Sequence, residues 1–402
     1  MDAAFAALNP PAAGLYALTT GLWIFAALGV VVAIGELARS ERDNRGLIAV
    51  LFGLGAAARL LAPDHLAMHY MGYEQITAAL SDGPVPKYGP GVVALQRVLL
   101  AHFAARVEVL IWANRVAGVL ALPLAYALMR RIGCGPRARM YGLIALIATP
   151  GLVAEATSES MWPWALVATL LAWERWLAFS SGLDTQGARI RFDALATTVA
   201  ASALALWSRP ELLAILPLGF GLLSWAAWRG RPAYNPGKRA MVVAAGAGAA
   251  VVLVALAARL VQLEAAMVRE AALGNTPEVF SGGLPSRIFG LLRDGLWRKN
   301  ALLEPRIFPF ALSFALALGA TFGHGPSRKT AQLLGLLALA ALVPGAADLP
   351  WVSLPRIHAP AMFFAAMAAG PATDALLTRA EARAAVAGRG SVVHSVTGRL
   401  VA

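Results

Sequence analysis

Long apolar runs recur along the whole chain, and they are the feature that most constrains its fold. Each run is about 17–25 residues long, which is the length that a helix needs to cross a bilayer core of roughly 30 Å. The chain has 402 residues, of which 59% are hydrophobic and only 14% are charged. So few charges could not cover the surface of a soluble protein of this size. The sequence therefore predicts an all-α, polytopic bundle of transmembrane helices.

The apolar runs predict about eleven membrane spans. They lie at roughly 14–37, 46–62, 109–129, 140–157, 161–179, 192–208, 211–228, 240–262, 306–323, 330–347 and 358–373. No positive residues precede the first run, and the run is long enough to span. We therefore interpret it as a membrane helix rather than a cleaved signal peptide. The single cysteine, Cys134, excludes an internal disulfide.

Arginine and lysine are concentrated in every second connection between the expected spans. They follow the first, third, fifth, seventh and ninth spans, and more of them lie in the tail after the eleventh. Because basic loops stay in the cytoplasm, the N-terminus is predicted outside and the C-terminus in the cytoplasm. The net charge of +12 follows from these loops. No basic stripe alternates with aromatic residues, so nucleic acid is not an expected partner.

The first long outer connection, 63–108, gathers polar residues in a chain that is otherwise poor in them. HLAMHYMGYEQITAAL and the later VVALQRVLLAHFAARVEVL carry apolar residues at helical spacing. Between them, SDGPVPKYGPG has the composition of a turn and contains Tyr88. We expect two amphipathic helices that lie on the outer membrane surface and are joined by this turn.

Asp64 is the first candidate for a catalytic residue. A carboxylate at the end of a span is partly desolvated, which makes it a stronger base that could take a proton from an attacking hydroxyl. It could also cap a surface helix that begins at His65, and one residue could do both. Glu74 would lie ten residues further along that helix, either as a second candidate base or as a solvated surface residue.

His65 and His69 are four residues apart and would share a helix face. With Asp64 they could hold a divalent metal. The HExxH pattern is absent, however, and interfacial polarity explains the two histidines without a metal.

Two further outer segments carry charges between apolar runs. Arg209 and Glu211 lie in SRPELL, where a charge is costly unless it is paired or used, so the two either pair with each other or bind a substrate. Arg356 and His358 lie immediately before the final span. The guanidinium there could bind a phosphate at headgroup level through two hydrogen bonds, or could simply anchor the helix to lipid.

Taken in order, these motifs resemble the GT-C superfamily of polytopic glycosyltransferases, and more narrowly the protein O-mannosyltransferase and lipid A aminoarabinose transferase-like families. The resemblance rests on an acidic residue after an early span and on a first outer loop of two surface helices. It then includes PKYGPG followed by ANRVAGVLALPLAYALMRRIG, ATPGLVAEATSESMWPWAL, SRPELLAILPL, and PRIHAP before the final span. It covers most of 46–372. We accordingly divide the chain into an extra N-terminal span and cytoplasmic loop (1–45), a GT-C-like core (46–373) and a basic cytoplasmic tail (374–402).

The resemblance implies an inverting transferase in the bacterial inner (plasma) membrane. It would move a hexose or pentose from a polyprenyl-phosphate donor to a lipid, glycan or protein acceptor on the outer, periplasmic face. Asp64 would be the base or would position the acceptor, and Arg356 would contact the lipid phosphate. Many members carry Asp-Glu where this chain has Asp64-His65, so Glu74 stays as the alternative base. We assign substrate-binding roles to His65, His69, Tyr88, Arg209, Glu211, Arg356 and His358. No cofactor is assigned, and a divalent metal stays the open alternative.

The competing function is transport, by a carrier or flippase for a lipid-linked sugar or another anionic lipid. Such a protein is expected to have ionisable groups at the bilayer midplane. Arg115, Glu155 and Arg259 come closest to that depth. We expect Arg115 to pair with Glu108 or Glu155, which would make it a packing residue.

Overall fold

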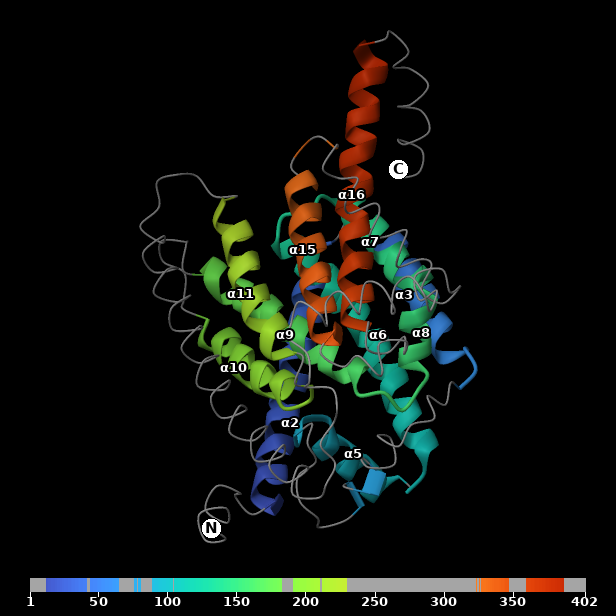
Figure 1. Ribbon diagram of the computed structural model, residues 1–402, viewed down its shortest axis with the longest axis vertical. Helices are drawn as coiled ribbons and strands as arrows, with labels where there is room; N and C mark the ends of the chain where they lie inside the picture. The colour runs from blue at the N-terminus through green and yellow to red at the C-terminus, as the bar shows by residue number, and fades with distance from the viewer. Residues whose placement is uncertain are drawn as a thin grey trace.

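The computed structural model describes residues 12–41, 44–64, 76–77, 79–80, 89–103, 105–182, 191–209, 212–229, 323, 325, 327–346 and 359–386. Within these residues, all regular structure is helical. The helices form an elongated bundle, and the C-terminal half of α16 extends beyond the other helices (Figure 1). The elements are α2 (Ala12–Ser40), α3 (Arg45–Leu60), α5 (Gly91–His102), α6 (Val107–Arg131), α7 (Pro136–Ala148), α8 (Pro150–Ala156), α9 (Trp162–Gly182), α10 (Phe192–Leu206), α11 (Leu212–Arg229), α15 (Ser327–Ala346) and α16 (Ala359–Val386).

Most of these helices coincide with the expected apolar runs, and three are long and apolar enough to cross a membrane. These three are Gly14–Ser40, Val107–Arg131 and Ala359–Ala385. The coarse prediction of an all-helical protein with helices able to cross a membrane therefore holds for the described residues. The count of about eleven spans stays a prediction, because only these three described helices are long and apolar enough, and the runs at 240–262 and 306–323 lie outside the described residues.

The run expected at 140–157 is divided into two helices, α7 and α8. Thr149 separates them, with φ −83° and ψ 104°, which is an extended conformation. Pro150 explains the break, because a proline disfavours helical geometry in the residue before it and has no N–H to continue the hydrogen-bond ladder. The expectation of one continuous helix here was wrong.

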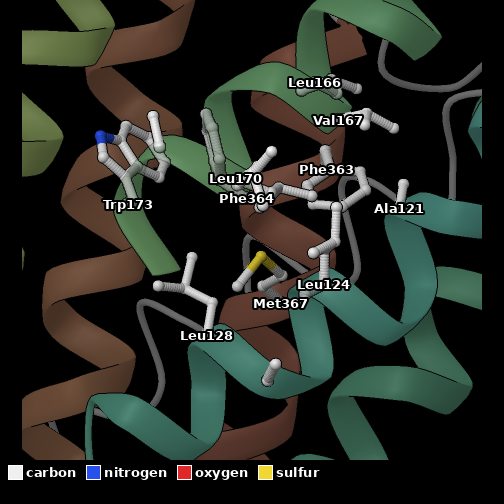
Figure 2. Packing of buried hydrophobic residues seen from close by; sticks show 14 of the residues in the cluster. Ala121, Leu124, Leu128, Leu166, Val167, Leu170, Trp173, Phe363, Phe364 and Met367 are labelled. Atoms are coloured by element: carbon white, nitrogen blue, oxygen red, sulfur yellow. The ribbon is translucent and has the colours of Figure 1, made fainter. Parts of the chain in front are cut away.

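The core lies where α6, α9 and α16 meet (Figure 2). The labelled side chains are Ala121, Leu124 and Leu128 from α6, Leu166, Val167, Leu170 and Trp173 from α9, and Phe363, Phe364 and Met367 from α16. The rings of Trp173 and Phe364 have centroids 5.4 Å apart. Because lipid tails are as apolar as leucine, helices in a membrane associate through this close packing rather than through the hydrophobic effect.

Small residues bring α7 and α16 into direct contact. A Cβ added to Gly370 would collide with the carbonyl oxygen of Ala138 and with the backbone of Gly142. Ala138 and Gly142 are four residues apart and so lie on one face of α7, which is the small-residue pattern of closely packed membrane helices. At this crossing the two backbones leave no room for a side chain at position 370.

The helix α5 belongs to the first long connection, 63–108, at the lower end of the bundle beside the start of α2 (Figure 1). The predicted second helix of this loop is divided, since α5 ends at His102 and Val107 begins α6. The first turn of α5 is buried on all sides, from Gly91 to Ala94, and the helix packs against α2, α6 and α10. That it also rests on a membrane surface stays a prediction, and most of the predicted first helix lies outside the described residues.

A network of ion pairs joins the helices at one end of the bundle. Glu36 on α2 accepts hydrogen bonds from Arg131 (2.6 Å) and Arg175 (3.0 Å) and forms an ion pair with Arg191 (2.5 Å). Glu174 binds Arg131 (2.9 Å) and Arg175 (2.5 Å). Further pairs are Arg139 with Glu41, and Arg137 with Asp374 and Glu381.

We call the end of the bundle that contains these ion pairs the basic end. The connections after the first, third and fifth expected spans thus meet there, as their charge pattern predicts, whereas the assignment of this end to the cytoplasm stays a prediction.

Gly219→Ala should destabilise the protein, because α11 touches Trp173 at this glycine. A Cβ at position 219 would collide with the buried indole, which donates a hydrogen bond from Nε1 to the carbonyl oxygen of Leu216 (3.2 Å). Overpacking of this kind costs about 1–3 kcal/mol. Gly221→Ala is the matched control on the same helix, since nothing lies within 4 Å of its added Cβ. Thermal unfolding of the purified protein in detergent should show a lower midpoint for Gly219→Ala alone, and equal midpoints would contradict this packing.

Candidate functional site

Asp64 lies four residues beyond Leu60, the last residue of α3. Its side chain is 51% exposed, and its Oδ1 accepts a hydrogen bond from Arg115 Nη2 at 2.5 Å. Among the described residues, no partner is found for Oδ2. A carboxylate that is fixed through one oxygen keeps the other oxygen available to a ligand.

Arg115 is buried, with 4% of its side chain exposed, and it caps the C-terminal end of α3. Its Nη1 donates to the carbonyl oxygens of Arg59 and Leu60, both at 2.7 Å, and its Nη2 donates to that of Ala62 at 2.8 Å. The last carbonyls of a helix have no partner inside the helix, so side chains or water must supply one. One guanidinium thus satisfies the end of α3 and orients Asp64.

A second buried arginine, Arg59, lies directly beside this cap. It is 2% exposed, and its guanidinium donates to the carbonyl oxygens of Gly55 (3.1 Å) and Leu146 (3.2 Å). Within the described part of the chain, no carboxylate forms an ion pair with it. Gly118 on α6 makes room for it, since a Cβ there would lie 3.2 Å from Arg59 Cδ and 2.5 Å from Ala156 Cβ. The meeting point of α3, α6 and α8 therefore has a buried positive charge.

The connection between α8 and α9 adds buried polar groups next to this point. Asn114, one residue before the capping arginine, donates from Nδ2 to the carbonyl oxygens of Ser158 (2.6 Å) and Ser160 (2.7 Å). Glu155 at the end of α8 and Glu159 in the connection are both buried. These hydrogen bonds hold the connection against α6.

Arg209 reaches the same region from the connection between α10 and α11. It is buried, and its guanidinium carbon lies 4.7 Å from the ring centroid of Trp162, the first residue of α9. Nearby, the backbone N–H of Gly91 donates to the carbonyl oxygen of Trp207 (2.9 Å), which attaches the start of α5 to the end of α10. We refer to Asp64, Arg115, Arg59, Asn114 and Arg209 as the Asp64 end of the bundle.

Of the predicted site residues, Asp64 and Arg209 are described and belong to this one end. Those outside the described residues are Glu74, His65, His69, Tyr88, Glu211, Arg356 and His358. The pairing of Arg209 with Glu211, the capping of a helix at His65 and the two-histidine metal site therefore stay predictions. In the part of the chain that the structure covers, no group of three His, Cys, Asp or Glu side chains is arranged to hold a metal ion.

The expected partner of Arg115 was wrong: it pairs with Asp64 rather than with Glu108 or Glu155. Glu108 is seven residues earlier on α6, about 10 Å along the helix axis, and so too far for the contact that residues three or four apart can make. The open carbonyls of α3 draw the guanidinium to that helix end instead. A sequence signal for this pair does exist. Arg115 lies inside one apolar run, and Asp64 follows directly after a different apolar run, so each is a charged residue that needs a partner.

Cys134 takes no part in this site. It is buried in the turn between α6 and α7, and burial raises the pKa of its thiol to about 12. The thiol therefore stays protonated at neutral pH and is a poor nucleophile.

Comparisons with models of protein families, with curated proteins and with solved structures found no match. The function is therefore argued from the chemistry of the Asp64 end.

Arg115→Gln should destabilise the bundle, because the shorter amide cannot reach all the carbonyl oxygens that the guanidinium satisfies. Leaving such groups without partners costs about 1–3 kcal/mol each, so we expect a loss of about 3 kcal/mol in the free energy of unfolding. The control is Arg106→Gln, because Arg106 is exposed and makes no side-chain capping hydrogen bond at the start of the same helix. Denaturant titration in mixed micelles should separate the two variants. Equal stabilities would show that the cap contributes little.

Proposed function

We propose that the protein is a membrane glycosyltransferase that moves a sugar from a polyprenyl-phosphate donor to an acceptor on the outer face of a bacterial inner membrane. The observation that carries this proposal is Asp64, a half-exposed carboxylate that a buried arginine holds at the end of a helix. The order of motifs that resembles the GT-C superfamily supports the same function.

Asp64 would act as the general base. Because Arg115 fixes one oxygen, the other can approach the hydroxyl of an acceptor in a defined orientation, and such positioning accelerates a reaction between two bound groups. The lipid, glycan or protein acceptor would enter from the water side of the interface. Glu74 is the alternative base, and His65, His69 and Tyr88 would contact the substrates.

The reaction would be a single displacement at the anomeric carbon. The acceptor oxygen forms a bond to this carbon while the bond from the carbon to the phosphate oxygen breaks. The bonding electrons leave with polyprenyl phosphate, and the acceptor proton passes to Asp64. Attack from the face opposite the leaving group inverts the configuration.

Negative charge grows on the phosphate as it leaves, and nearby cations stabilise that state more than the ground state. Arg209 is buried against Trp162 at the same end of the bundle as Asp64. We propose that Arg209 and Arg356 bind the donor phosphate, and that Glu211 and His358 contact other parts of the substrates. A divalent metal between His65 and His69 would supply the same stabilisation and stays the open alternative.

The competing proposal is a transporter or flippase for a lipid-linked sugar or another anionic lipid, and the two differ in their products. A transferase releases free polyprenyl phosphate, whereas a transporter leaves the lipid-linked sugar intact on the other side of the membrane.

Asp64→Asn should abolish transfer, because the amide cannot accept the proton. The assay would use the purified protein in liposomes with a set of synthetic polyprenyl-phosphate hexoses and pentoses, and would measure free polyprenyl phosphate. General base catalysis contributes about 10²–10⁴-fold, so we expect a loss of at least about 100-fold. Glu108→Gln is the control, an exposed acid in the first turn of α6. Undiminished release in Asp64→Asn would refute the assignment of the base, and movement of intact donor across the bilayer without release would favour transport.

A further inference from the structure

A groove of about 440 Å³ lies between α2, α3 and α6, away from the Asp64 end. Its walls include Ile34 and Leu37 on α2, Ile48 and Phe52 on α3, and Leu120 on α6, while Glu41 and Arg45 lie at its polar mouth. Arg45 begins α3 and Leu60 ends it, so the mouth is about 22 Å from the Asp64 end along this helix. The groove is therefore separate from the proposed catalytic site.

We propose that this groove is a binding site for an anionic phospholipid, with one acyl chain between α2, α3 and α6 and the phosphate at Arg45. The proposal rests on the shape of the groove, its surroundings and its charge, and it does not depend on the proposed transferase function.

A proline shapes the inner wall of the groove. Pro123 lies inside α6 and lines the groove together with Val119. Proline has no N–H, so the carbonyl oxygen of Val119, four residues earlier, loses its usual helical partner. Both α2 and α3 pack against α6. Pro123 and Val119 thus give the groove an apolar inner wall between these two helices.

The surfaces of α2 and α3 on both sides of the groove expose apolar side chains, as the lipid-facing surfaces of membrane helices do. Leu28 and Val31 on α2 are more than half exposed, and so are Val50 and Leu54 on α3. In a bilayer these side chains meet lipid tails, so the occupant that reaches the groove is a chain from the surrounding leaflet. From Arg45 to Phe52 the helix rises about 10 Å, which is enough depth for a substantial part of an acyl chain.

The polar mouth favours a negative headgroup. Glu41 is already neutralised, since Arg139 Nη1 donates to its Oε1 at 2.6 Å. Arg45 is exposed, and it uses Nε and Nη2 to hold the carbonyl oxygen of Ala38 at 3.1 and 2.8 Å. These two bonds hold the guanidinium at the entrance, and no carboxylate pairs with it in the described residues. A lipid phosphate would complete its coordination.

Lipid retention by the full-length protein tests the proposal. The purified protein would be reconstituted with equal amounts of phosphatidylglycerol and phosphatidylcholine, and native mass spectrometry would count the lipids that stay bound after transfer to detergent. We expect wild-type protein to retain phosphatidylglycerol about fivefold better than phosphatidylcholine, the ratio that corresponds to about 1 kcal/mol for one arginine at an anionic membrane surface. Arg45→Gln should lose this preference, whereas Arg45→Lys should keep it.

Two further variants separate the groove from the general surface. Ala49 lines the groove and Val50 does not, although both are exposed on α3. Ala49→Phe should fill the groove and reduce retained lipid of either kind, whereas Val50→Phe should not. Arg383→Gln, on the far part of α16, is the control for charge.

Three results would overturn the proposal. Equal retention of the two lipids by wild-type protein would show that the groove does not select an anionic headgroup. Unchanged retention in Ala49→Phe, with a normal unfolding midpoint, would show that the lipid binds elsewhere. A dimer that Ala49→Phe dissociates would make the groove an interface with a second copy of the chain.

Discussion

The contact on which the Asp64 end depends is the one between Arg115 and the end of α3. The last carbonyl oxygens of a helix have no partner inside it, so side chains or water must supply the donors. Arg115 supplies donors from the third turn of α6 and binds three carbonyl oxygens in addition to Asp64. The position of the candidate base is thus set by the same guanidinium that makes this helix end possible.

The two ends of the bundle use charge in different ways. At the basic end, Glu36 and Glu174 lie between arginines from several helices, so opposite charges are close and mutually satisfied. Such an arrangement joins helices, and these paired side chains themselves keep little capacity for a ligand. At the Asp64 end, the buried Arg59 has only carbonyl partners among the described residues, and Asp64 is half open to solvent. Charges that the fold does not fully neutralise are the ones that a substrate can use.

The sequence predicted the helices better than the contacts between them. The apolar runs predicted most of the helices, because the bilayer fixes the length of a helix that spans it. The basic residues in alternate connections predicted that α2, α6 and α9 have charged ends on the same side of the bundle. The break between α7 and α8 was missed although Pro150 signals it locally. Most partners of the arginines could not be predicted, because Asp64 is 51 residues from Arg115, Glu174 is 43 from Arg131 and Glu36 is 139 from Arg175. Such pairs depend on how the helices pack, and a single sequence does not contain that information in a local pattern. The pair of Glu174 with Arg175 is different, because these two are neighbours in the chain. For the site itself, the sequence pointed to Asp64 and Arg209, which do lie at one end, but gave no indication that Arg115 would hold Asp64.

Arg115 and Asp64 act as one unit, and a double-mutant cycle measures this coupling directly. The free energies of unfolding would be determined for the wild-type protein, Asp64→Asn, Arg115→Gln and the double variant in mixed micelles. Because Asp64 is half exposed and solvent screens the pair, the account predicts a coupling energy of about 1 kcal/mol. Effects that add to within about 0.3 kcal/mol would contradict it, and would mean that Asp64 is placed by something other than the buried arginine.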